Sequence, residues 1–274
     1  MSPEVITETI SPIVIDEDWE NPPMPPTDLI YDDGEPLESN RHRIAMNVLI
    51  HSLEQGWSDR NDFFTGGNMF VYYNINQIRN KDFRGPDFFA VLDVDGTKSR
   101  KAWVTWEENG RYPDVIVELM SPSTAEIDKT IKKDIYGQIF RTRNYFVFSP
   151  FDPNSLQGWH LDVNFQYQPL EPNERGWLRC ETLGFWLGTW EGTINRETAI
   201  WLRFYDDLGN LVPLPEEAAQ AHAEQERQIA EQERQRAEQE HQRAEQERQR
   251  AEQEHQRAER LTAQLRALGI EPES

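Results

Sequence analysis

Two acidic residues accompany segments that have the composition of buried β-strands. Glu118 interrupts an apolar run at residues 115–120, and Asp87 stands at the start of the run PDFFAVLD at residues 86–93. A carboxylate inside such a strand loses favourable hydration unless a cation or hydrogen-bond donors meet it. Glu118 is therefore either one half of a structural ion pair or a metal ligand. Asp87 by itself indicates no more than the start of a strand.

The segment that follows Glu118 has the periodicity of a helix. Four isoleucines recur at every fourth position: Ile127, Ile131, Ile135 and Ile139. We expect this stripe to face the sheet, because an amphipathic helix buries its apolar side. Ser123 and Glu126 fit a capping box at the start of the helix.

The lysines of this helix differ in where their side chains can point. At about 100° per residue, Lys129 and Lys133 lie well away from the isoleucine stripe and point to solvent. Lys132 shares a row with Asp128 and Tyr136 that borders the stripe, so it is the lysine that can lean toward the end of the strand. The alternative for Lys132 is a boundary lysine paired with Asp128 one turn away.

A helix before the strands is expected to begin at Leu37 and to end at Gly56. Its apolar residues share one face: Leu37, Ile44, Ala45, Val48, Leu49 and Leu53. Glu38 and His42 lie one turn apart beside that face. They form an ordinary pair at the border of a helix unless a site lies nearby.

The remaining strand patterns define the fold class. Three strand-like runs precede the central strand, at residues 68–73, 86–93 and 103–107. Turn residues separate them, so we expect a meander that leads into residues 115–120. Residues 144–149 predict another buried strand, and residues 151–205 predict further antiparallel strands. This order predicts an α/β fold in which helices pack on a mixed β-sheet.

The acidic residues are concentrated at the two ends of the chain. The net charge is −21. Residues 1–40 contain eleven Asp or Glu and no Lys or Arg, and the chain from residue 216 onward has fifteen Glu and nine Arg. Residues 41–215 therefore carry a net charge of only −4. No strongly basic patch is visible, which argues against tight, non-specific binding of DNA without excluding a local basic cleft.

Cysteine content and hydropathy bear on the cellular compartment. Cys180 is the single cysteine, which excludes an intramolecular disulfide and fits a reducing compartment. The sequence shows no signal peptide and no apolar run of about 18 to 20 residues, the length that a membrane span needs. We therefore expect a soluble, cytoplasmic protein.

Two appendages flank the predicted domain at residues 37–215. Residues 1–36 are acidic and rich in proline, and we expect them to form an arm. Residues 216–274 contain a heptad repeat of Ala, Glu, Gln and Arg, which predicts a long helix. Alanine recurs every seven residues, with Glu three positions later where a coiled coil needs a second apolar residue. The coiled-coil seam is therefore weak, and Leu261, Leu265 and Leu268 offer apolar contacts only at its end.

Several of these segments together resemble a known family. GPD at residues 85–87, PDVIVELMSPST at 113–124, and Asp128 followed by Lys132 and Tyr136 resemble the Uma-two family. Its members are classed with endonucleases of the PD-(D/E)xK, restriction-endonuclease-like superfamily. The resemblance covers about residues 24–215. It implies a restriction-endonuclease-like mixed sheet flanked by helices, here followed by the long C-terminal helix.

The resemblance also implies roles for particular residues. Asp87 and Glu118 become the acidic ligands of a Mg²⁺ or Mn²⁺ ion, and Glu38 becomes a third carboxylate. In the general superfamily a lysine stands two residues after the glutamate, but Met120 occupies that position here. The resemblance assigns the missing positive charge to Lys132. Another departure is RTRNYFVFS at residues 141–149, where many relatives have a Gly-Val turn and further acidic residues.

Two hypotheses follow for the function. The first is an endonuclease in which a metal-activated water hydrolyses DNA phosphodiester bonds. The second is a catalytically idle nuclease fold that acts as a binding or regulatory module. In the second, the helical tail recruits a protein partner or a second copy of the chain. The carboxylates and Lys132 favour the first hypothesis, and the acidic arm and near-neutral domain favour the second.

Overall fold

A computed structural model describes residues 29–31, 39–74 and 83–267. The chain divides into two compact units, one up to Val212 and one from Pro213 onward. Most of the predicted acidic arm, together with Glu38, lies outside the described residues.

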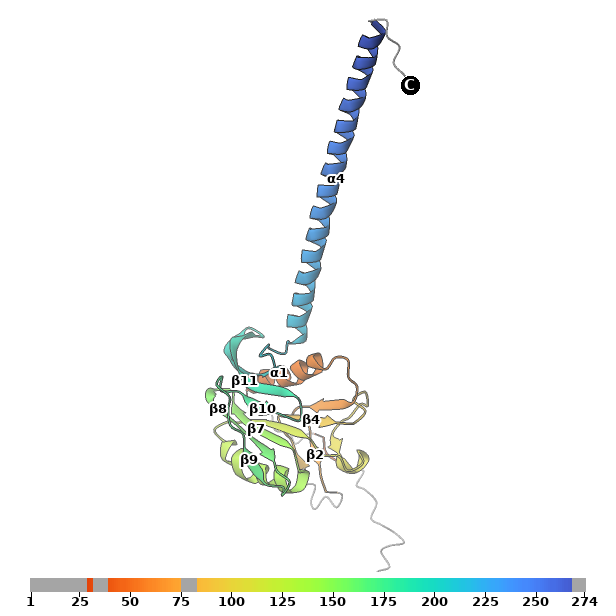
Figure 1. The fold of residues 1–274 in the computed structure, drawn as a ribbon. Coiled ribbons are helices and arrows are strands. Elements are labelled where there is room, and N and C mark those ends of the chain that lie inside the picture. The colour runs from red at the N-terminus through yellow and green to blue at the C-terminus, as the bar shows by residue number, and fades with distance from the viewer. Residues whose placement is uncertain (1–28, 32–38, 75–82, 268–274) are drawn as a thin grey trace, which may run out of the picture. The chain divides into compact units, whose positions relative to one another are not determined.

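The first unit is built on a six-stranded mixed sheet (Figure 1). Its strands, in spatial order, are β1 (Phe63–Gly66), β4 (Phe88–Leu92), β6 (Val115–Leu119), β7 (Asn144–Ser149), β8 (Asp152–Leu161) and β9 (Tyr167–Pro169). Among the described strands of this sheet, β6 and β7 pair in parallel, and a helical crossover connects them. The mixed sheet and the buried strands predicted at residues 115–120 and 144–149 are confirmed.

The central strand β6 is buried along its whole length. Side chains alternate between the two faces of a sheet. On one face, Ile116 belongs to a cluster with Phe89 and Tyr145. On the other face, Phe88 lies 6.1 Å from Phe204 between ring centroids. Because both faces are covered, β6 is almost entirely apolar, and Glu118 is its only charged residue.

Helix α1 (Asn40–Gly56) contacts β4, β6 and β12 (Glu197–Tyr205). The side chain of its N-cap, Ser39, accepts a hydrogen bond from the backbone N–H of His42. Its buried face contains the described residues that the sequence predicted: Ile44, Ala45, Val48, Leu49 and Leu53. The predicted end of the helix at Gly56 is also confirmed.

Two smaller sheets complete this unit. One contains β10 (Leu178–Cys180), β11 (Phe185–Ile194) and β12 in antiparallel order. The other contains β3 (Phe83–Arg84), β2 (Val71–Tyr72) and β5 (Trp103–Val104), which is followed by the 3-10 helix η3 (Thr105–Glu107). The predicted meander is therefore wrong. β2 and β5 pair in parallel in a separate sheet that also contains β3, and of the three predicted strands β4 alone joins β6.

The crossover between β6 and β7 is a helix over residues 125–140, which we call the site helix. It consists of α2 (Ala125–Ile127), the π-helical η4 (Asp128–Lys132), α3 (Lys133–Ile135) and the π-helical η5 (Tyr136–Phe140). The predicted capping box is wrong. The N-cap is Thr124, and the hydroxyl of Ser121 accepts hydrogen bonds from the backbone N–H groups of Ser123 and Thr124.

The site helix presents a different face to the sheet from the one predicted. Ile127, Ile131 and Ile139 are 45%, 57% and 44% exposed, whereas Tyr136 and Phe140 are 0% and 3% exposed. The prediction failed because the sheet face at this point contains Glu118, which requires polar partners. In an α-helix, residues four apart are rotated by about 40° from one another around the helix axis. The wider π-helical turns offset this rotation. Asp128, Lys132 and Tyr136 therefore stay in one row that faces the strand.

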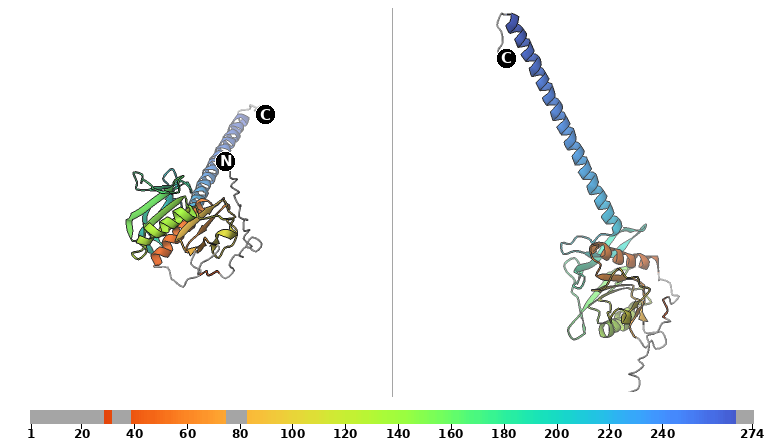
Figure 2. Two further views of the ribbon diagram at one scale, coloured as in Figure 1. Left: turned by 90° about the horizontal axis from the view of Figure 1, so that it is seen from below. Right: turned by 90° about the vertical axis from the view of Figure 1, so that its right-hand side faces the viewer.

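The second unit contains α4 (Pro215–Ala267), a helix of 53 residues with no buried residue. It is unbroken in all views (Figures 1 and 2). Glu–Arg pairs three residues apart lie along it, such as Glu231–Arg234 at 3.1 Å and Glu245–Arg248 at 3.6 Å. The predicted long, solvated helix is thereby confirmed. None of the helices in the described parts of the chain combines the length and apolar character needed to cross a membrane.

A truncation after Pro215 tests how far the first unit depends on α4. Because α4 buries no residue, the truncated protein should keep its melting temperature within about 2 °C, since surface changes typically cost less than about 0.5 kcal/mol. It should lose much of the helical circular-dichroism signal at 222 nm. A large drop in melting temperature would show that α4 is part of the core.

Candidate active site

The antiparallel pairing of β4 with β6 brings Asp87 and Glu118 together. Phe88 lies opposite Val117 in this register, so one further step places Asp87 opposite Glu118. Directly opposed residues of an antiparallel pair project from the same face of the sheet. The backbone N–H of Leu119 donates a hydrogen bond of 2.7 Å to Oδ2 of Asp87 and fixes its position at the strand end.

Glu118 is fully buried, and each of its carboxylate oxygens accepts a hydrogen bond. The hydroxyl of Tyr136 donates to Oε1 at 2.7 Å, and the ammonium of Lys132 donates to Oε2 at 3.0 Å. Both donors come from the site helix and lie one turn apart on its inward row. Glu118 is therefore part of an ion pair, one of the two alternatives that the sequence left open.

Lys132 is held between two carboxylates. Its Nζ lies 3.0 Å from Oε2 of Glu118 and 2.8 Å from Oδ1 of Asp128. Burial alone would lower the pKa of Lys132, but the charges of Glu118 and Asp128 outweigh burial and raise the pKa above its ordinary value. Lys132 is therefore a fixed cation at neutral pH and not a proton acceptor.

The acidic groups of this cluster repel one another. Burial and the charge of Glu118 raise the pKa of Asp87 well above its ordinary value. The same two causes, burial first, raise the pKa of Asp128. Burial, and then the charge of Glu118, also raise the pKa of Tyr136 well above its usual range, so this hydroxyl stays protonated and donates a hydrogen bond to Glu118. Three neighbouring carboxyl groups thus lie near the single ammonium group of Lys132.

This donor set fits a small divalent cation. Mg²⁺ prefers oxygen ligands and is commonly bound through one or two carboxylates, with water completing its coordination. Asp87 and Glu118 supply two carboxylates from adjacent strands. Within the described residues, no three His, Cys, Asp or Glu side chains are grouped to hold a metal ion by themselves. Within those residues, a further ligand can come from the main chain or from water. Glu38, which the resemblance implies as a third carboxylate, lies outside them.

The structure brings together three of the four residues that the resemblance singled out: Asp87, Glu118 and Lys132. The hydroxyl of Tyr136 is a further functional group that reasoning from the sequence did not assign. The signal was present in the four-residue spacing of Asp128, Lys132 and Tyr136, which places all three on one row. The alternative pairing of Lys132 with Asp128 is also confirmed. Lys132 therefore both reaches the end of the strand at Glu118 and pairs with Asp128 one turn away.

The helical pattern predicted that Lys133 points to solvent, but the side chain of Lys133 packs against an aromatic ring. Its Nζ lies 3.9 Å from the centroid of the Trp159 ring, and burial lowers the pKa of this lysine. The prediction was wrong because it considered the helix alone, and Trp159 comes from β8. Lys133 nevertheless makes none of the contacts with Asp87 or Glu118 that define the cluster around Lys132.

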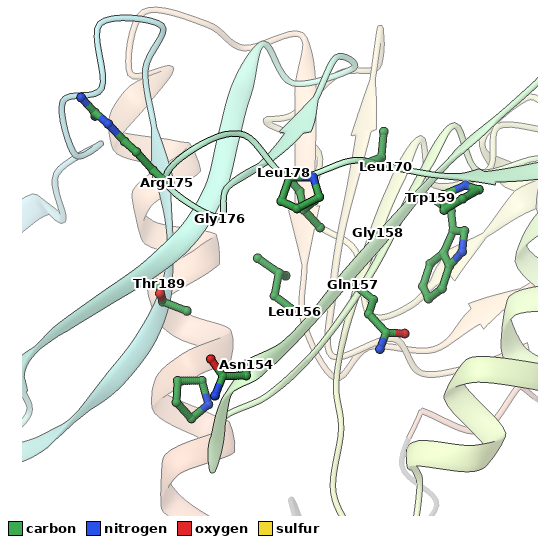
Figure 3. Close-up of a pocket in the computed structure, with 13 residues that line it drawn as sticks. Asn154, Leu156, Gln157, Gly158, Trp159, Leu170, Arg175, Gly176, Leu178 and Thr189 are labelled. Atoms are coloured by element: carbon green, nitrogen blue, oxygen red, sulfur yellow. The ribbon is translucent and has the colours of Figure 1, made fainter.

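A cavity of about 550 Å³ lies elsewhere on the first unit. Figure 3 shows it between β8, the loop after β9, β10 and β11. Leu156, Leu178 and Trp159 contribute to its lining, and Arg175, a further lining residue, stacks its guanidinium over Trp177 at 4.9 Å. None of the residues that line it is acidic. This cavity therefore offers no carboxylate to a divalent cation, unlike the strand ends of β4 and β6.

Fold and site together define an α/β protein with a carboxylate pair on adjacent strands and a lysine donated by the crossover helix. Residues 17–191 match the model of the Uma2 family, described as "Putative restriction endonuclease". The chain belongs to this family, which confirms the family that its motifs resemble. No curated protein matches the chain.

One solved structure with similarity to the chain is titled as a "putative nuclease belonging to DUF820" from Anabaena variabilis ATCC 29413. The two sequences are 10% identical, and the TM-score is 0.39. The similarity covers 56% of this chain and 81% of that chain.

Tyr136→Phe tests whether the hydroxyl of Tyr136 is required by the buried Glu118. The substitution removes a donor to a carboxylate and should lower the free energy of unfolding by about 1.5–3 kcal/mol, measured by urea denaturation. Tyr167→Phe is the matched control, because its hydroxyl donates to the neutral carbonyl of Thr142 at 2.9 Å. That change should cost about 0.5–1.5 kcal/mol. Equal or reversed costs would contradict the role of Tyr136.

Proposed function

We propose that this protein is a Mg²⁺- or Mn²⁺-dependent endonuclease that hydrolyses phosphodiester bonds of DNA in the cytoplasm. The observation that carries the proposal is the convergence of Asp87 and Glu118 at adjacent strand positions, with Lys132 3.0 Å from Glu118. Membership of the Uma2 family, described as "Putative restriction endonuclease", supports the same class of reaction.

Asp87 and Glu118 would hold the divalent cation. A bound cation of this kind lowers the pKa of a water ligand and neutralises charge on the scissile phosphate. The elevated pKa of Asp87, caused by burial and by Glu118, supports this assignment, because a cation would relieve the repulsion between the two carboxylates. Without a cation, keeping the neighbouring carboxyl groups of Asp87 and Glu118 both ionised is costly.

The other residues of the cluster orient and balance the charge of the site. The backbone N–H of Leu119 fixes Asp87, and the hydroxyl of Tyr136 fixes Glu118. Lys132 supplies a permanent positive charge next to the carboxylates. A fixed ammonium group in a partly buried site stabilises negative charge that develops on the phosphate oxygens in the transition state.

The competing candidate is an idle nuclease fold that serves as a binding or regulatory module, with α4 recruiting a protein partner or a second copy. One observation favours it: both oxygens of Glu118 already accept hydrogen bonds, from Tyr136 and Lys132. In this alternative the network of Glu118, Lys132 and Asp128 is purely structural. Millimolar Mg²⁺ would then leave the melting temperature unchanged, whereas a metal site predicts an increase.

Cleavage of plasmid DNA tests the proposed function directly. The purified protein should nick or cut the plasmid with Mg²⁺ or Mn²⁺ and not with EDTA. Asp87→Ala and Glu118→Ala should each reduce cleavage by at least about 100-fold, because each removes a ligand and a charge from the same site. Circular dichroism checks that both variants remain folded. Cleavage by both variants at the parental rate would refute the site.

The lysines of the site helix provide an internal comparison. Lys132→Ala should reduce the rate of cleavage by about 100-fold, since it removes the charge beside Glu118. Lys133→Ala should retain most of the activity, because Lys133 contacts Trp159 and not the carboxylates. Initial rates at matched protein and metal concentrations measure the difference. Equal losses, or a greater loss for Lys133→Ala, would show that the positive charge is not supplied by Lys132.

A further inference from the structure

Asp128 is a buried carboxylate to which the proposed reaction assigns no role. It is only 1% exposed, and its Oδ1 lies 2.8 Å from the ammonium of Lys132. Leaving a carboxylate this deeply buried is unfavourable unless a charged partner compensates it. Exposed acidic residues of the same helix, such as Asp134, make no comparable contact with Lys132.

The main chain of Asp128 is anchored to the sheet. Its carbonyl accepts a hydrogen bond of 2.8 Å from the hydroxyl of Tyr145 on β7, and its N–H donates to the carbonyl of Thr124 at 2.9 Å. Asp128 also begins the π-helical stretch that ends at Lys132. The carboxylate therefore projects from a backbone position that is fixed relative to the parallel strand pair β6–β7.

Lys132, by contrast, has a long and flexible side chain. Holding an ammonium group on a four-carbon stem in one place costs rotamer entropy, which a second acceptor helps to offset. Glu118 provides one acceptor, but the proposed function also requires Glu118 to bind a cation. A cation on Glu118 weakens the attraction between Glu118 and Lys132, because both compete for the same negative charge. Asp128 is the partner that remains available to Lys132.

We propose that Asp128 is a positioning residue that keeps the ammonium of Lys132 beside the Asp87–Glu118 pair when Glu118 binds a cation. The inference rests on the proposed function. It assigns Asp128 no contact with substrate or metal. Its effect on the reaction passes entirely through Lys132.

A double-mutant cycle between Asp128→Asn and Lys132→Ala tests this inference. In the parent background, Asp128→Asn should reduce kcat for DNA cleavage by about 10- to 100-fold, the range typical of residues that orient an active-site group. KM should change little. In the Lys132→Ala background, Asp128→Asn should cause no further loss, because the group through which it acts is absent. Asp134→Asn, which removes the same charge from an exposed position of the helix, should leave the rate unchanged.

A second cycle uses the metal-free protein and does not depend on cleavage. The shifts in urea midpoint caused by Asp128→Asn and Lys132→Ala should be non-additive, because the two residues are in direct contact. If Asp128→Asn does not fold, Asp128→Ser replaces it in both cycles. Additive shifts would overturn the contact, and additive losses of kcat would overturn the positioning role. If the parent protein fails to cleave DNA, the proposed function is overturned, and the metal-free cycle alone decides whether Asp128 holds Lys132.

Discussion

The burial of Glu118 in the central strand is the constraint on which the site depends. β6 is covered on both faces, so a charged group within it must be stabilised by a bound cation or by protein partners. The site helix supplies them through Tyr136 and Lys132, one donor for each carboxylate oxygen. Removing Lys132 would leave the buried charge of Glu118 without its cation, and removing Tyr136 would leave one oxygen of Glu118 without a donor. The same requirement fixes the position of the helix relative to the strand.

This constraint explains the unusual orientation of the site helix. An amphipathic helix ordinarily turns its apolar side toward the sheet. Here the polar row of Asp128, Lys132 and Tyr136 faces inward at the end of β6, and Ile127 and Ile131 remain exposed. π-helical turns are frequently found at functional sites, and the two in this helix keep the polar row aligned. The helix thus gives up part of its apolar burial to deliver charged groups to the site.

Much of the fold could be predicted from local patterns, and the failures have a common cause. Helix α1, strands β6 and β7 and the helix α4 each follow from the apolar or polar periodicity of their own segment. The pairing of β2 with β5, the exposed isoleucines and the contact of Lys133 with Trp159 depend on segments distant in sequence. For the same reason Asp87 was a weak signal alone. Its importance comes from the register that places it opposite Glu118.

We propose that Asp87 and Glu118 form one binding site for a divalent cation, adjacent to Lys132. The most direct measurement is a crystal structure of the protein grown with Mn²⁺, with anomalous diffraction data used to locate the ion. We expect a single strong anomalous peak within coordination distance of carboxylate oxygens of both Asp87 and Glu118, and no such peak in crystals of Asp87→Asn. A peak at other residues, or none at saturating Mn²⁺, would contradict it.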